Sequence, residues 1–266
     1  MQRFDYERAD SVDAAVAALK GGDAAVIAGG QTLLPAMKHR LAATDRLVDI
    51  ARLADLKGIA LDGDVLRIGT AETHAEVAAS QTVRDAIPAL AALAAGIGDP
   101  AVRHRGTIGG SVANNDPSAD YPAAMLALGA TIETTGGPIP ADAFFTGMFE
   151  TALGEGEIVT ALSVPRPLRA AYVKHRHPAS RYALAGVFVA QTRDGIRVAV
   201  TGAGADGVFR ASGIEAALST DVDPGAIPDD AVPTDGLIGD MHAAPDYRAA
   251  LVVAMARRAV ATMIAD

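Results

Sequence analysis

The chain has 266 residues, of which 50% are hydrophobic but only 4% aromatic, and acidic residues outnumber basic ones by 32 − 23 = 9. This length predicts about two domains, and the acidic balance argues against a nucleic-acid-binding surface. The chain contains no cysteine, which excludes disulfides, thiolate-bound zinc, iron–sulfur ligation and a catalytic thiol within it.

The N-terminal segment predicts alternating helices and strands around a glycine loop. Ser11 is a favoured N-cap, and Gly21 and Gly22 are expected to end the helix that it begins. Pro35 fits the first turn of the next helix, where its missing N–H does no harm. The expected elements are a helix over 12–19, a strand over 24–28, a helix over 34–41 and a strand over 46–50.

The central segment predicts a hairpin that turns at Asp62-Gly63, followed by alanine-rich helices. The glycine- and polar-rich stretch from Gly96 to Pro122 is expected to be a long loop. Pro165 and Pro167 close a strand and mark a domain boundary. The expected elements are strands over 59–61 and 65–68, helices over 73–79 and 88–95, and a strand over 158–164.

Beyond the prolines, the sequence predicts a second hairpin that turns at Asp194-Gly195, with strands over 184–191 and 196–201. A loop rich in proline and aspartate follows over 221–235, and an amphipathic helix is expected over 247–264. These elements indicate an antiparallel sheet with helices.

Two loops, over 28–33 and 107–111, combine adjacent glycines with small polar side chains. Glycine lets the backbone adopt positive φ and lets a ligand approach without meeting a Cβ, so successive N–H groups can converge on a phosphate. Both loops could hold one pyrophosphate. The alternative is that each loop is only a tight turn.

A third glycine motif, Gly202-Ala203-Gly204-Ala205-Asp206-Gly207, matches the G-x-G-x-x-G pattern of nicotinamide-binding proteins. Its context does not fit, because the preceding strand is expected in an antiparallel hairpin and the next helix cannot begin before about Ser212. Asp206 would also repel a pyrophosphate. We therefore interpret this segment as a connecting loop.

The first two loops belong to longer motifs, over 27–35, 98–111 and 114–122, at a specific spacing. Together they resemble the FAD-binding domain of the p-cresol methylhydroxylase type, as found in flavin subunits of the xanthine dehydrogenase and carbon monoxide dehydrogenase family. Further similar stretches lie over 68–76, 157–160, 177–183 and 247–248. The resemblance implies an α+β fold: an FAD-binding domain over 1–167, with subdomains over about 1–57 and 58–167, and a smaller C-terminal domain over 168–266.

The resemblance also implies a set of cofactor-binding residues. The two loops would bind the FAD diphosphate and ribityl chain, Asp120 would accept a hydrogen bond from a sugar or ribityl hydroxyl, and Lys174 would reach the cofactor. Alternatively, Asp120 caps a helix over 121–128, and Lys174 is an ordinary solvated lysine. The implied residues are Ile27, Ala28, Gly29, Gly30, Gln31, Thr32, Leu33, Ile97, Thr107, Ile108, Gly109, Gly110, Ser111, Asp120, Val159 and Lys174.

The implied function is that of a flavoprotein subunit of a molybdenum hydroxylase. A molybdenum–pterin large subunit would hydroxylate the substrate, a [2Fe-2S] small subunit would relay electrons, and FAD on this chain would pass them to an external acceptor. The resemblance also implies a dimer of such heterotrimers. A cytoplasmic location is expected, because the N-terminus is acidic and no long apolar run is present.

No catalytic side chain and no metal site are expected in this chain. His175 and His177 lack a third ligand nearby, and no nucleophilic triad or acid–base pair is evident. Two alternatives remain open: a free-standing FAD-dependent reductase on the same fold, which would need its own proton donor, and a nonenzymatic assembly subunit that has lost its flavin.

Overall fold

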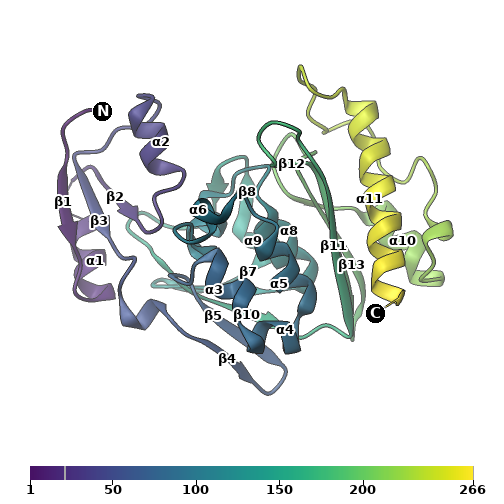
Figure 1. Ribbon diagram of the computed structural model, residues 1–266, viewed down its shortest axis with the longest axis horizontal. Helices are drawn as coiled ribbons and strands as arrows, with labels where there is room; N and C mark the ends of the chain where they lie inside the picture. Colours follow the sequence, from purple (N-terminus) through teal and green to yellow (C-terminus); the bar gives the residue numbers. More distant parts are fainter. Residues whose placement is uncertain (21, 266) are drawn as a thin grey trace.

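The computed structural model describes residues 1–20 and 22–265, in which three main sheets follow one another along the chain (Figure 1). The first sheet is parallel, with strand order β1-β3-β2. Its helices lie between the strands in sequence, because parallel neighbours require a crossover connection. The elements are β1 (Asp5–Arg8), α1 (Val12–Leu19), β2 (Ala24–Ile27), α2 (Leu33–Lys38) and β3 (Arg46–Asp49).

Local signals explain most of this first unit. The hydroxyl of Ser11 accepts a hydrogen bond from the Ala14 amide at 3.0 Å and begins α1, as predicted. Helix α2 ends at Lys38, earlier than predicted. Strand β1 was not predicted, because its four residues are all exposed and give no hydrophobic alternation. The expected helix end at Gly21 lies outside the described residues.

The second sheet is antiparallel, with strand order β4-β5-β10-β6-β7. Helices α3, α4, α5, α7 and α8 supply most of the apolar core against it. Its predicted first hairpin is confirmed. The strands are β4 (Ile59–Asp62), β5 (Val65–Gly69), β6 (Thr131–Thr134), β7 (Gly137–Pro140) and β10 (Val159–Pro165), with a separate pair β8 (Phe145–Gly147) and β9 (Glu150–Thr151). The helices are η1 (Ala54–Leu56), α3 (His74–Ala79), α4 (Gln81–Ala86), α5 (Pro88–Ala95), α6 (Pro100–Arg103), α7 (Ile108–Asn114), α8 (Asp120–Leu128) and α9 (Ala141–Phe144).

The expectation of a long loop over 96–122 was wrong, since this stretch contains α6, α7 and the start of α8. The hydroxyl of Thr107 accepts a hydrogen bond from the Gly110 amide at 3.1 Å and caps α7. The side chains of Ile108 and Val112 then pack fully buried in the core. Tertiary packing and a cap thus outweigh the low helix propensity of the paired glycines.

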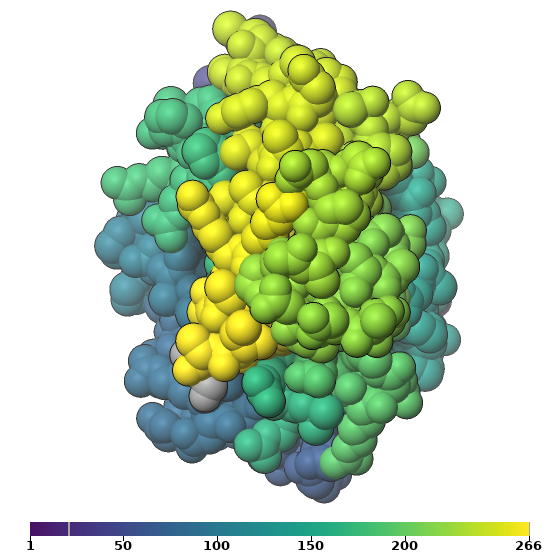
Figure 2. Space-filling view, turned by 90° about the vertical axis from the view of Figure 1, so that its right-hand side faces the viewer, coloured from purple at the N-terminus to yellow at the C-terminus, as the bar shows by residue number. Residues whose placement is uncertain are grey.

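The third sheet is antiparallel, with strand order β11-β12-β13-β14, and includes the predicted second hairpin. Helices α10 and α11 cover its outer face, as Figures 1 and 2 show, while α8 packs on the inner face. Alternation along β12 divides the core, because Phe188 faces inward and Val187 faces the outer helices. The elements are β11 (Arg169–Arg176), β12 (Ala183–Thr192), β13 (Gly195–Thr201), β14 (Phe209–Arg210), α10 (Ser212–Thr220), η2 (Pro224–Ala226) and α11 (Pro245–Ala265).

The fold class is α+β, as predicted, with one small parallel sheet and two larger antiparallel sheets. In the part of the chain that the structure describes, no helix is both long enough and apolar enough to cross a membrane.

Candidate cofactor site

A cavity of about 780 Å³ lies where the loop after β2, the start of α7 and the end of β11 meet. This volume is within the range of roughly 300–1,000 Å³ that is usual for small-molecule sites. Every residue of the expected cofactor set lines it except Ile108. The Ile108 side chain points into the core, and its amide donates to the Glu72 carbonyl at 2.9 Å.

The loop over 29–32 offers a row of free backbone donors. Among the described residues, none of the four amides has a hydrogen-bond partner, and all four residues line the cavity. Gly30 adopts φ +67°, a conformation that side-chain-bearing residues rarely take. Successive free N–H groups of this kind form a concave site for an anion such as a phosphate.

The loop over 107–111 was expected to offer free N–H groups to a pyrophosphate, but it does not. Its amides from 108 to 111 are all occupied, by the Glu72 and Thr70 carbonyls and by the hydroxyl and carbonyl of Thr107. Its glycines instead provide space: a Cβ on Gly109 would lie 2.3 Å from the Thr70 Cβ, whereas a Cβ on Gly110 would meet only the Thr107 hydroxyl, at 3.0 Å. This loop therefore contributes clearance and the half-buried Ser111 hydroxyl rather than free amides.

Close backbone contact brings the two glycine loops together. A Cβ on Gly29 would lie 2.2 Å from the Arg105 carbonyl oxygen, so only glycine allows this approach. Gly29 and Arg105 are 76 residues apart in sequence, by 105 − 29. Arg105 lies two residues before the loop over 107–111, and the two loops form adjoining walls of one cavity.

A buried ion pair forms another part of the wall. Lys174 donates to Asp120 at 2.7 Å, and both side chains are about 95% buried. The Tyr172 hydroxyl donates to the second carboxylate oxygen. Burial raises the pKa of Asp120, while Lys174 and Tyr172 oppose the shift. The alternative of a solvated Lys174 was therefore wrong, and so was that of a capping Asp120, since Ala119 is the N-cap of α8 and no side chain caps it.

Among the wall residues that were not assigned a role from the sequence, three are titratable groups with shifted pKa values: His74, Asp116 and Tyr182. Burial, reinforced by the Arg103 charge, lowers the pKa of His74 to about 4, so its imidazole is neutral near pH 7. Burial also raises the pKa of Asp116. All three lie within the motifs that carry the resemblance, which was the available signal, but no spacing rule marks them individually.

The glycine motif over 202–207 is a loop, as predicted. It follows β13, which pairs antiparallel with β12, and α10 begins only at Ser212. The amide of Gly202 donates to the Pro117 carbonyl at 2.7 Å, so the motif packs against the start of α8. Within residues 1–20 and 22–265, no group of three histidine, aspartate or glutamate side chains could hold a metal ion.

Comparison with known proteins identifies the family. Residues 2–167 match the family described as the FAD-binding domain in molybdopterin dehydrogenase. The chain is 34% identical to the carbon monoxide dehydrogenase medium chain of Hydrogenophaga pseudoflava, over 97% of this chain and 96% of that one.

This chain belongs to the FAD-binding medium subunits of molybdenum hydroxylases. It is also 33% identical to the nicotine 6-hydroxylase medium subunit of Paenarthrobacter nicotinovorans, over 90% of this chain and 89% of the relative. A solved structure of carbon monoxide dehydrogenase from Hydrogenophaga pseudoflava superposes with a TM-score of 0.91 at 35% identity, covering 99% of this chain and 98% of that one. The medium subunit is thus part of an oxidoreductase, and FAD is its cofactor.

The cavity has the chemistry that FAD requires. Free amides over 29–32 suit a diphosphate, and each oxygen of Asp120 keeps a lone pair for a hydroxyl beyond the donors that it already has. Apolar side chains, including Ile97 and Val159, supply a surface for a ring. The residues present therefore fit the cofactor that the family binds.

Proposed function

We propose that this medium subunit is the electron exit of its complex. Electrons from [2Fe-2S] clusters on a small subunit would reach FAD in the cavity and leave to an external acceptor, after a molybdenum-containing large subunit has hydroxylated the substrate. The observation that carries the proposal is the single cavity whose wall combines free amides over 29–32, clearance at Gly110 and the buried Asp120 carboxylate.

The protein's own residues would bind and orient the cofactor. The amides over 29–32 would hold the diphosphate, Asp120 would accept from a sugar or ribityl hydroxyl, and Ile97 and Val159 would contact the ring system. Lys174 is paired with Asp120, so the two charges largely compensate each other at the cofactor. FAD, when bound, supplies the redox chemistry, and the protein supplies binding and electrostatics.

The proposal extends to organisation and assembly. We assign residues 1–167 to an FAD-binding domain, with subdomains over about 1–57 and 58–167, and residues 168–266 to a C-terminal domain. The parallel sheet, the central sheet and the C-terminal sheet follow this division along the chain. The relatives are medium chains of carbon monoxide dehydrogenase and nicotine 6-hydroxylase, which supports assembly with a large and a small subunit. The proposal includes a dimer of such heterotrimers in the cytoplasm.

Purification of the tagged medium subunit from its native host tests the proposal. The expected result is co-purification with one larger and one smaller redox subunit, and one FAD per medium subunit. Purification alone, with bound FAD and reductase activity, would favour a free-standing reductase. A colourless complex that takes up no added FAD would contradict the cofactor assignment and favour an assembly role.

Substitution of Gly110 tests the site within the same complex. Gly110→Val places a branched side chain at the cavity wall and is expected to lower FAD content at least tenfold. Gly110→Ala is the matched control, because replacing a helical glycine with alanine usually stabilises by about 0.5–1 kcal/mol. Thermal unfolding reports the fold of both variants. Normal FAD content in folded Gly110→Val would contradict the assignment of this wall.

A further inference from the structure

The C-terminal sheet holds the segment that presents Asp120 to the cavity. Tyr172 and Lys174, both on β11, donate to the two oxygens of the Asp120 carboxylate. Just before α8, the Thr201 hydroxyl on β13 contacts the Pro117 and Ala119 carbonyls at 2.9 and 2.6 Å. The start of α8 is therefore fixed by side chains that lie outside the matched FAD-binding region over 2–167.

The sheet is built to accommodate the Tyr172 hydroxyl. Gly186 lies in the buried strand β12 opposite Lys174, and a Cβ there would approach the Tyr172 hydroxyl oxygen to 2.5 Å. Glycine in a strand interior is unfavourable unless something must approach closely. The Tyr172 ring also stacks on the fully buried Phe188, with centroids 6.0 Å apart. The phenol is thus fixed in direction.

We propose that Tyr172 is a positioning residue for the cofactor: together with Lys174 it fixes the Asp120 carboxylate in the orientation that accepts a cofactor hydroxyl. This inference rests on the proposed role of Asp120. Two donors occupy one lone pair on each carboxylate oxygen, so the plane of the carboxylate cannot rotate without breaking a bond. The free lone pairs are thereby held in a fixed direction at the cavity wall.

The charges around Asp120 determine how the loss of Tyr172 would act. Burial raises the pKa of Asp120, and Lys174, the hydrogen bond from Tyr172 and Arg176 oppose this shift. Burial and the Asp120 charge raise the pKa values of the neighbouring Tyr121 and Tyr182 phenols, and the Asp116 charge also raises that of Tyr182. Burial and the Asp120 charge raise the pKa of Tyr172 well above its ordinary value, so its hydroxyl keeps the donated proton.

Tyr172→Phe in the assembled complex tests the inference, and Tyr121→Phe is a matched control. The Tyr121 hydroxyl is also fully buried and has no hydrogen-bond partner among the described residues. Affinity for FAD is measured on FAD-depleted protein by flavin fluorescence between pH 5 and 8. Tyr172→Phe is expected to weaken binding about tenfold, which is typical when a hydrogen bond to a charged group is lost.

The pH profile separates positioning from mere stability. Loss of the Tyr172 donor raises the Asp120 pKa, so the pH below which FAD binding weakens should be higher in Tyr172→Phe than in wild type. Tyr121→Phe should leave affinity and profile unchanged. Wild-type affinity and profile in folded Tyr172→Phe would overturn the inference. Wild-type affinity in Asp120→Asn would instead show that the proposed role of Asp120 itself is wrong.

Discussion

At the residue scale, His74 is a buried titratable group in the cavity wall. Only 5% of its surface is exposed, and its Nδ1 has no hydrogen-bond partner in the described part of the chain. Its ring lies 5.5 Å from that of Tyr121. A cation at this position would be desolvated and would face Arg103, which explains why its pKa falls to about 4.

This shift predicts an acid-sensitive stability. The folded pKa of His74 lies below the unfolded value of 6.5, so the unfolded chain takes up a proton first as the pH falls. The His74 contribution to the free energy of unfolding is therefore fully present above pH 6.5 and is lost as the pH falls from 6.5 to 4. From pH 7.5 to 5 the loss should be about 2 kcal/mol. Urea unfolding across this range measures it.

His74→Gln is expected to remove this part of the pH dependence, since glutamine does not titrate. His39→Gln is the matched control, since it makes the same substitution at an exposed position. A wild-type slope in His74→Gln would show that other groups account for the acid sensitivity.

At the scale of elements, local signals predicted the hairpins well. The two-residue turns are Gly63-Asp64 and Arg193-Asp194, each shifted by one residue from the predicted pair. They lie between strands that pair with each other, so each hairpin is encoded within about ten to twenty residues. The glycine motif over 202–207 was rejected as a nucleotide site on similar local grounds, because it follows a strand of the second hairpin. Helices α6 and α7 were missed, because glycine and polar residues were taken as loop signals. Asp99 and Thr107 instead cap these two helices.

The cofactor site was predictable only in part, because long-range contacts determine the role of several of its residues. Family motifs pointed to the residues of the wall, but not to which glycine makes room for backbone and which for a ligand. That difference arises from contacts such as Gly29 with Arg105, which only the folded chain reveals. Tyr172 was missed entirely, because its partner Asp120 is 52 residues away and no motif links them.

Helix α11 is attached to the C-terminal sheet through Arg248. This side chain is buried and donates to the Leu184 and Gly202 carbonyls at 2.7 and 2.6 Å, and to Asp240 at 2.7 Å. Arg248→Met should reduce the free energy of unfolding by about 3 kcal/mol, because two buried carbonyls lose their charged donor and Asp240 loses its partner. Urea denaturation of the purified variant measures the loss.

The control lies on the same helix. Arg257 donates to the Ile227 carbonyl at 2.6 Å and pairs with Asp229, whose side chain is 92% exposed. Arg257→Met is therefore expected to cost only about 1 kcal/mol. Equal losses in the two variants would contradict a special role for the buried arginine.

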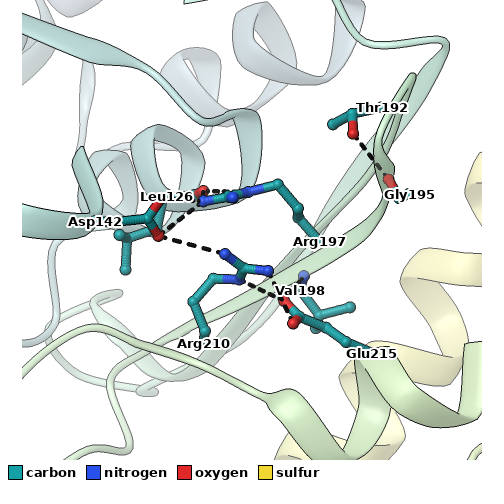
Figure 3. A network of polar contacts seen from close by, with 8 residues as sticks. All are labelled: Leu126, Asp142, Thr192, Gly195, Arg197, Val198, Arg210 and Glu215. Atoms are coloured by element: carbon teal, nitrogen blue, oxygen red, sulfur yellow. Dashed lines mark hydrogen bonds and ion pairs between the residues drawn. The ribbon is translucent and has the colours of Figure 1, made fainter. Parts of the chain in front are cut away.

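At the scale of the whole molecule, the C-terminal sheet holds helix α8 at both ends. At the first end, Tyr172 and Lys174 bind Asp120. At the second end, Arg197 on β13 donates to the Leu126 carbonyl at 2.7 Å and to Asp142, as Figure 3 shows. A cation is favourable at a helix C-terminus because it faces the negative end of the helix dipole.

Figure 3 also shows how this second contact is extended across the sheet. Arg210 reaches the same Asp142 carboxylate and pairs with Glu215 of α10, whose carboxylate accepts from the Val198 amide at 2.7 Å. The network thereby joins α8, α9, β13, β14 and α10. Asp142 is half exposed, so the ion pairs that it makes contribute little. The bonds from Arg197 to the Leu126 carbonyl are therefore the stabilising part of the Arg197 contact.

The two ends of α8 should therefore respond differently to substitution. Arg197→Met is expected to lower the free energy of unfolding by about 1–2 kcal/mol and to speed hydrogen exchange at the end of α8. FAD affinity should change less than threefold, since Asp120 lies about 9 Å along the helix from Leu126 at 1.5 Å per residue. Arg193→Met, which removes an exposed pair with Asp64, should change none of these three quantities. Tyr172→Phe should show the opposite pattern, with the larger effect on FAD affinity.

If Arg197→Met weakened FAD binding as much as Tyr172→Phe, the sheet would act on the cavity through α8 as one rigid body rather than through Asp120 alone.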